Sequence, residues 1–189
     1  TAEEIRIYGE EGDDLITISI AEGNLLTGQV NIFGGAGEDQ IIVNRLHTRM
    51  GDHNGDDERD TVDIDGGDDR DLYFIYTRGD ETDQYTRAYD TGASGVDEMV
   101  IYGTSEDDVF LLRAMNIPDQ TTPDTGFVAK INADGAGIER FNYRGIEGIT
   151  LNTLYGDDYV VADDTLVAFT INGGVGDDSF QIGQVFKSE

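Results

Sequence analysis

The chain of 189 residues contains no cysteine and no tryptophan, and it has only two prolines. Without cysteine, neither a disulfide framework nor a thiolate metal site can form. No apolar run approaches the roughly 18 residues of a membrane-spanning helix, so we expect no membrane insertion. The sequence begins at Thr1 without an initiator methionine or a signal peptide. We therefore expect a piece of a larger repeat protein that forms one domain over residues 1–189.

Cationic side chains are also scarce, with 12 Lys and Arg against 40 Asp and Glu, which gives a formal charge of -28. Such an acidic surface repels nucleic acid and anionic lipid, and it attracts cations. The acidity does not indicate disorder, because 38% of the residues are hydrophobic and they occur in short runs typical of strands. The 25 glycines indicate strands that are closed by tight turns.

One short pattern recurs along the chain: an apolar pair, a glycine-rich acidic turn, and an aspartate followed by alternating apolar residues. It reads IYGEEGDDLITI at Ile7 to Ile18, IFGGAGEDQIIV at Ile32 to Val43 and INGGVGDDSFQI at Ile171 to Ile182. Aligning the last aspartate of each turn, looser copies included, gives Asp14, Asp39, Asp60, Asp71, Asp108, Asp158 and Asp178.

The gaps between these aspartates are 25, 21, 11, 37, 50 and 20 residues. Gaps of 20 to 25 residues match one solenoid coil of two or three short strands, and a gap of 11 matches half a coil. One coil cannot bury its apolar face alone, so stacked coils form a continuous core. Alternation after each turn predicts the core residues Ile16, Ile18, Ile41, Val43, Val62, Ile64, Phe110, Leu112, Phe180 and Ile182.

Stacking brings the acidic turns close together. Neighbouring parallel strands lie about 4.7–4.9 Å apart, so equivalent carboxylates would form a ladder. A like-charge pair at that distance costs on the order of 3 kcal/mol at an effective dielectric constant of about 20. Several such pairs exceed the net stability of a typical domain, roughly 5–15 kcal/mol. The ladder is therefore expected to require a counter-ion.

Calcium is the cation that best matches these turns. It takes six to eight oxygen ligands from carboxylates and backbone carbonyls, and glycine lets the backbone turn tightly enough to supply them. Magnesium demands octahedral geometry and keeps its waters. Zinc is disfavoured because the chain has no cysteine and only two histidines, His47 and His53. The alternative to metal binding is a purely structural role, because glycine and aspartate are common in tight turns.

The turns GEEGDD (Gly9 to Asp14), GGAGED (Gly34 to Asp39) and GGVGDD (Gly173 to Asp178) resemble the RTX, or hemolysin-type, calcium-binding repeat, G-G-x-G-x-D-x-U-x. The resemblance implies an all-β, right-handed parallel β-helix or β-roll (β-solenoid), type I secretion, and folding on extracellular calcium. It implies that several calcium ions are held by the carboxylates of Asp14, Asp39 and Asp178 and by carbonyls of Gly9, Gly12, Gly34, Gly37, Gly173 and Gly176.

The chain departs from the family pattern in that its repeats are spaced and not tandem nonapeptides. The turn from Gly103 to Asp108 lacks the middle glycine, and the turn from Gly66 to Asp71 has Asp69 in its place. The looser copies nevertheless add Asp60, Asp71, Asp108 and Asp158 as candidate ligands. Spaced repeats of this kind resemble those of very large calcium-binding surface proteins.

Two segments lack the repeat pattern and are expected to loop out of the stack as irregular insertions, residues 76–95 and residues 114–126. Between the second insertion and the next repeat, ERFNY and GITLNTLYG are expected to form strands on either side of Arg144 to Gly148.

Catalysis is not expected. His47 and His53 lie in a polar stretch, and the chain has neither an H-E-x-x-H motif nor a G-x-S-x-G motif. With 40 acidic residues, a chance carboxylate pair says little about glycosidase chemistry. Tyr73, Tyr76 and Tyr85 are candidates for a sugar-binding groove, although tyrosine in strands usually packs.

The sequence thus predicts a calcium-binding structural module of a secreted or cell-surface protein, with adhesion, matrix or surface-layer roles. Its expected partners are calcium, neighbouring repeats of the same parent chain and, as a further candidate, surface polysaccharide. Two alternatives stay open: a non-catalytic RTX module of a secreted protease, lipase, alginate epimerase or toxin, and a carbohydrate-binding solenoid.

Overall fold

The computed structural model describes residues 4–21, 26, 28–48, 61–79, 83–115, 124–131 and 138–183. Every regular element in these ranges is a β-strand. None of the described segments forms a helix of the length and hydropathy that crossing a bilayer would take. The strands are β1 (Glu4–Glu11), β2 (Leu15–Ser19), β3 (Gln29–Ala36), β4 (Gln40–Asn44), β5 (Val62–Asp68), β6 (Leu72–Tyr76), β7 (Gln84–Tyr89), β8 (Glu98–Tyr102), β9 (Val109–Ala114), β10 (Gly126–Ile131), β11 (Ile138–Arg144), β12 (Gly148–Asn152), β13 (Tyr159–Asp163), β14 (Ala168–Asn172) and β15 (Ser179–Ile182).

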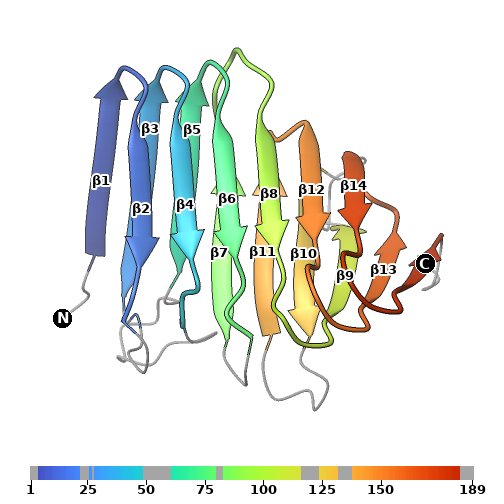
Figure 1. Cartoon of the computed structure of the whole chain (residues 1–189). Helices are drawn as coiled ribbons and strands as arrows, with labels where there is room; N and C mark the ends of the chain where they lie inside the picture. The colour runs from blue at the N-terminus through green and yellow to red at the C-terminus, as the bar shows by residue number, and fades with distance from the viewer. Residues whose placement is uncertain are drawn as a thin grey trace.

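The strands form two sheets that face each other (Figure 1). One sheet has nine strands in the order β1-β3-β5-β7-β11-β10-β9-β13-β15, and the other has six in the order β14-β12-β8-β6-β4-β2. Every strand pair is parallel except the two that β10 makes, with β9 and with β11. Because the chain passes from one sheet to the other and back, it winds in the manner of a β-solenoid. The expected all-β and mainly parallel architecture is confirmed.

The core lies between the two sheets and consists of apolar side chains stacked in register. In the six-stranded sheet, Ile16 pairs with Ile41, Ile41 with Tyr73, and Tyr73 with Met99. Period-two alternation directs these residues inward on every strand of this sheet, so each coil continues the apolar column of the last. Full burial of one such side chain stabilises the fold by about 1.5–3 kcal/mol. Six residues of the predicted core are at most 1% exposed: Ile41, Val43, Val62, Ile64, Phe110 and Leu112.

The core prediction is wrong at the last coil, where Phe180 and Ile182 are 48% and 69% exposed. Both residues lie on β15, which pairs only with β13. At the other end, Ile16 and Ile18 on β2 are only partly buried, since β2 pairs only with β4. An alternating pattern predicts which face a residue lies on, but not whether another coil covers that face.

The prediction that residues 76–95 form a loop is also wrong, because residues 84–89 form β7, which pairs with β5 and β11. Its inward residues are Gln84, Thr86 and Ala88, all buried. These side chains are polar or small, so the strand carries no hydrophobic alternation. Of the second expected insertion, 114–126, residues 116–123 lie outside the described residues. The expected strands on either side of Arg144 to Gly148 are confirmed as β11 and β12.

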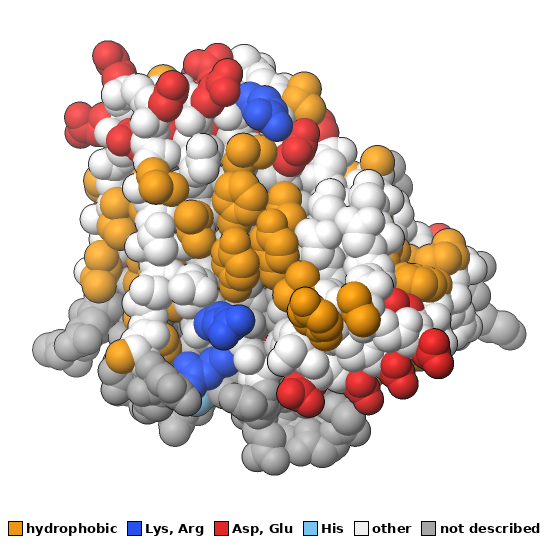
Figure 2. Space-filling view, viewed as in Figure 1, with side chains coloured by type: hydrophobic (Ala, Val, Ile, Leu, Met, Phe, Trp, Pro, Cys, Tyr) orange, Lys and Arg blue, Asp and Glu red, His pale blue; other side chains and the backbone are white. Residues whose placement is uncertain are grey.

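The acidic turns lie at two different edges of the stack, because the turn at residues 103–108 leads from β8 back to β9. At the edge that we call the first edge, β1, β3, β5, β7 and β11 connect to the six-stranded sheet. At the opposite edge, the second edge, β8, β12 and β14 connect back to the nine-stranded sheet. The first edge is at the top of Figure 1 and the second at the bottom. Figure 2 shows acidic side chains gathered at both of these places.

Candidate metal site

In the acidic turns that follow β1 and β3, an aspartate folds back over a glycine five residues earlier. A Cβ atom at Gly9 would lie 2.6 Å from Oδ2 of Asp14 and 2.5 Å from the carbonyl oxygen of Gly34. A Cβ at Gly34 would overlap Oδ2 of Asp39 and lie 2.5 Å from the carbonyl oxygen of Gly66. The space that a side chain would fill at each glycine thus holds a carboxylate oxygen and a carbonyl oxygen from the next coil.

Hydrogen bonds join these aspartates into a continuous column. The main-chain N–H of Asp14 donates to Oδ1 of Asp39 at 2.8 Å, and that of Asp39 donates to Oδ1 of Asp71 at 2.8 Å. The N–H of Asp71 donates to Oδ1 of Asp97 at 2.8 Å, and that of Asp97 donates to Oε2 of Glu147 at 2.7 Å. We call these five residues the first column. Asp39, Asp71 and Asp97 therefore each accept from the preceding member of the column through Oδ1.

The second oxygens of this column are buried without a hydrogen-bond partner. This holds for Oδ2 of Asp14, Asp39 and Asp71. Asp39 is 1% exposed and Asp71 is fully buried. A buried carboxylate oxygen without a partner is unfavourable by several kcal/mol unless it is protonated or bound to a cation. The first column is therefore rich in oxygen ligands and has no side-chain cation of its own among its members.

The pKa values of the column reflect this burial. Burial, assisted by the charges of Asp90, Asp39 and Asp97, raises the pKa of Asp71 to about 7. Burial likewise raises the pKa of Asp97 to about 6, and it raises the pKa of Asp39 above its usual range. The charged form of each carboxylate is destabilised, and a divalent cation would restore it.

Three carboxylates of this region converge most closely. One oxygen each of Asp71, Asp90 and Asp97 lie within 4.8 Å of one another, and all three residues are buried. Tyr73 positions Asp90, because its hydroxyl donates to Oδ2 of Asp90 at 2.5 Å and accepts from the N–H of Gly66 at 2.6 Å. Burial, opposed in part by this hydrogen bond, raises the pKa of Asp90. Three buried aspartates in this arrangement could hold a metal ion.

The second edge carries a separate and shorter column. The N–H of Asp108 donates to Oδ1 of Asp158 at 2.8 Å, and that of Asp158 donates to Oδ1 of Asp178 at 3.1 Å. Oδ2 of Asp158 is buried without a hydrogen-bond partner. Burial raises the pKa of Asp158, against a lowering by the hydroxyl of Thr153. The sequence analysis expected one ladder, and the structure divides its members between two edges.

Asp108 differs from the other turn aspartates because it has a cation beside it. Nζ of Lys130, on β10, lies 3.2 Å from Oδ1 of Asp108, and both side chains are almost fully buried. Thr104 donates to both carboxylate oxygens, from its N–H at 2.7 Å and its hydroxyl at 2.9 Å. The inserted antiparallel strand thus brings a lysine to the start of the second column.

The turn glycines of the sequence pattern lie at positions with positive φ angles or close contacts to the adjacent coil. Gly12, Gly37 and Gly176 have φ angles of 111°, 131° and 145°, a region that residues with a Cβ rarely adopt. A Cβ at Gly37 would lie 2.5 Å from the carbonyl oxygen of Gly12 in the adjacent coil. Gly173 lies beneath the carboxylate of Asp178 as Gly9 does beneath Asp14. Asp60 lies outside the described residues.

The sequence analysis did not single out Asp90, Asp97 or Glu147. Asp97 was detectable, because it precedes the strand EMVIY as Asp71 precedes LYFIY, with a spacing of 26 residues that matches one coil. Asp90 has no such signal, since its hydrogen bond from Tyr73, a residue of another strand, joins it to the cluster. Searches among protein families, curated proteins and solved structures found no match to this chain.

Proposed function

We propose that the chain is a calcium-binding structural module, whose buried acidic columns hold divalent ions between successive coils. The observation that carries this proposal is the row of unpartnered, buried carboxylate oxygens of Asp14, Asp39 and Asp71. Oxygen ligands alone favour a hard cation, and carboxylates mixed with carbonyls favour calcium over magnesium. The likeness of three turns to the RTX repeat supports the same ion.

The proposal includes coupling between calcium and folding. The unfolded chain has no preformed site, so binding to the folded chain adds to its stability as the calcium concentration rises. Extracellular calcium modules typically bind with dissociation constants of about 0.1–1 mM. We therefore place the module on a secreted or cell-surface protein, exported through a type I pathway at low cytosolic calcium, without a catalytic role.

The winding and the partners belong to the same proposal. Connections between parallel strands of one sheet are right-handed in about 98% of cases, which supports a right-handed helix. Exposed apolar side chains on the outermost strands, such as Leu15 on β2 and Ile182 on β15, support stacking against neighbouring repeats of a parent chain. In that setting the calcium-loaded rod serves adhesion, matrix or surface-layer roles.

The test compares the chain with and without a chelator. Calcium titration by calorimetry, together with far-ultraviolet circular dichroism and thermal unfolding, should show saturable binding and a marked rise in the melting temperature. Magnesium at the same concentration should give a much smaller rise. A melting temperature that does not respond to calcium would overturn the proposal, as would calorimetry without binding heat.

A further inference from the structure

A row of side chains crosses the outer face of the nine-stranded sheet near the first edge. Tyr8 on β1 pairs with Phe33 on β3, and Phe33 pairs with Asp65 on β5. Asp63 pairs with Arg87 on β7, so continuing that register by two residues places Asp65 beside Tyr89. Tyr89 in turn pairs with Arg144 on β11. The row thus has aromatic rings on both sides of one short acidic side chain.

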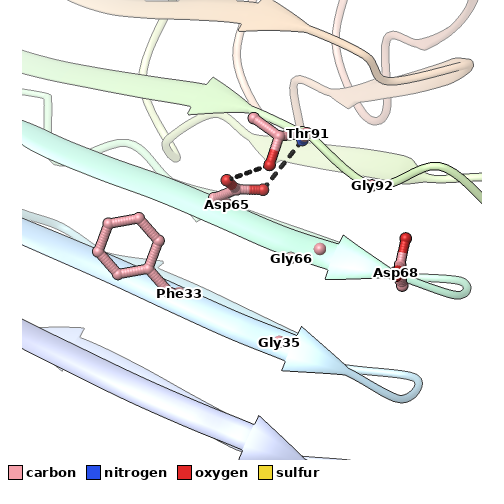
Figure 3. A pocket seen from close by; sticks show the side chains of 8 residues that line it. Phe33, Gly35, Asp65, Gly66, Asp68, Thr91 and Gly92 are labelled. Atoms are coloured by element: carbon pink, nitrogen blue, oxygen red, sulfur yellow. Dashed lines mark hydrogen bonds between the residues drawn. The ribbon is translucent and has the colours of Figure 1, made fainter.

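The short side chain of Asp65 leaves a slot between the rings. Two adjoining hollows, of about 290 and 250 Å³, share Phe33, Asp65 and Thr91 in their linings. Figure 3 shows the ring of Phe33 at one side of Asp65, with Thr91 on the other side of the carboxylate. Tyr89 and Arg144 line the second hollow. The slot therefore lies on the outer face and is separate from the buried acidic columns.

Phe33 and Tyr89 each have a stacking partner on the side away from the slot. Tyr8 stacks on Phe33 with ring centroids 5.1 Å apart, and it does so from the β1 side. The guanidinium of Arg144 lies 4.7 Å from the ring centroid of Tyr89, and it does so from the β11 side. Phe33 and Tyr89 are two strand spacings apart, roughly 9–10 Å. A ring packed between two others needs about 7–8 Å, so the slot can accept one ring.

The charged groups that line the second hollow balance one another. Thr91 donates to both oxygens of Asp65, from its N–H at 3.0 Å and its hydroxyl at 2.7 Å. Asp63 is paired with Arg87, whose Nε lies 2.6 Å from Oδ1. The second hollow is thus lined by two aspartates and two arginines, in a chain whose overall charge is -28. This local neutrality favours neither an anionic nor a cationic ligand.

We infer that this slot binds one neutral pyranose unit of a glycan. A pyranose ring presents apolar C–H faces, which pack on aromatic rings, and hydroxyl donors at its rim. Asp65, held in place by Thr91, would accept from those hydroxyls, and Arg87 would donate to their oxygens. This function goes beyond calcium-dependent rigidity and uses none of the first-column residues.

The test is a screen of the calcium-loaded chain on an array of neutral and charged glycans, followed by calorimetry with the best sugar. Phe33→Ala and Asp65→Ala should each weaken binding about tenfold. Tyr102→Ala is the matched control, because Tyr102 stacks on Tyr76 on the outer face of the other sheet. It should leave the affinity unchanged.

Calcium-dependent melting of the same samples checks that each variant is folded, so a loss of sugar binding is separable from a loss of calcium binding. Three results would overturn the inference: an array without neutral-sugar signals, a sugar affinity unchanged in both slot variants, and preferential binding of tetramethylammonium. The last result would identify the slot as an aromatic cage for organic cations.

Discussion

The main-chain N–H of Asp39 donates a hydrogen bond of 2.8 Å to Oδ1 of Asp71, while Oδ2 of Asp71 is buried without a partner. One oxygen thus joins the coils and the other is left for a cation. The first function needs only an acceptor, but the second needs a negative charge. Substitutions that keep the acceptor and remove the charge should therefore separate them.

Asp71→Asn is the sharpest such substitution. The amide oxygen can still accept from Asp39, so the metal-free chain should be as stable as the parent or more stable, because a buried charge among Asp90 and Asp97 is gone. Calcium affinity should fall by at least about tenfold, since a metal ligand worth more than roughly 1.4 kcal/mol is lost. Calorimetry and thermal unfolding with and without calcium measure the two effects.

Glu38→Gln is the control for this experiment. Glu38 is one residue from Asp39, its side chain is exposed, and the substitution removes the same charge. It should change calcium affinity by less than about twofold, because exposed charges are screened by solvent. Equal losses of affinity in both variants would mean that net charge, and not a coordinating site, attracts the ion.

Gly34→Ala should damage the fold and the column together. The added Cβ would overlap Oδ2 of Asp39 and lie 2.5 Å from the carbonyl oxygen of Gly66. We expect a loss of about 3 kcal/mol in the free energy of unfolding, the upper range for forced overpacking.

Gly148→Ala is the matched control, because the nearest atom to its added Cβ is Cγ of Glu98 at 3.9 Å. Denaturant unfolding should show a change within about 0.5 kcal/mol there. Similar losses in both variants would contradict the role given to Gly34.

The sequence predicts the coil and its turns well because both depend on local patterns. The G-x-x-x-x-D spacing of Gly34 and Asp39 recurs, and the alternation after each aspartate marks the inward residues. Local patterns also explain the failures. Gln84, Thr86 and Ala88 face inward on β7 without being large and apolar, so the sequence pattern predicts a loop in place of this strand.

The division of the acidic turns between two edges was not predictable from spacing. It depends on the turn at 103–108 joining β8 to β9 and on the hairpins that return the chain to β11. A gap of 37 residues between Asp71 and Asp108 is compatible with either edge. The pairing of Lys130 with Asp108 is equally hidden, because it follows from the antiparallel register of β10.

Lys130 acts in the second column as a built-in counter-ion, and its removal should destabilise the fold. Lys130→Met leaves the carboxylate of Asp108 buried without the lysine beside it. We therefore expect the free energy of unfolding to fall by about 3–5 kcal/mol at saturating calcium. Arg70→Met removes an exposed ion pair with Glu98 and should lower the free energy of unfolding by less than about 1 kcal/mol. Chemical denaturation measures both variants.

Adding Asp108→Asn to Lys130→Met tests the cause of that loss. If the uncompensated charge of Asp108 is responsible, the double variant should recover part of the stability. Recovery should be incomplete, because Lys130 also lowers the pKa of the buried Glu139. A double variant less stable than Lys130→Met would show that the lysine acts through packing.

Protons and calcium should compete for the same carboxylates, which gives the metal-free chain an unusual pH dependence. Burial raises the pKa of Asp71 to about 7, of Asp97 to about 6 and of Glu139 to about 7, against about 4 in an unfolded chain. The folded chain therefore binds more protons than the unfolded chain between about pH 4 and 7. Stability therefore rises as the pH falls through this window and is lost as the pH rises through it, with no further change from these groups above about pH 7. In chelator, the melting temperature at pH 5 should exceed that at pH 8 by roughly 5 °C.

Saturating calcium should shrink or reverse this difference in melting temperature, because bound carboxylates release their protons. Asp71→Asn should reduce the difference in chelator, and Glu38→Gln should preserve it. A metal-free chain that melts lower at pH 5 than at pH 8 would mean that these carboxylates are ionised and satisfied without a metal.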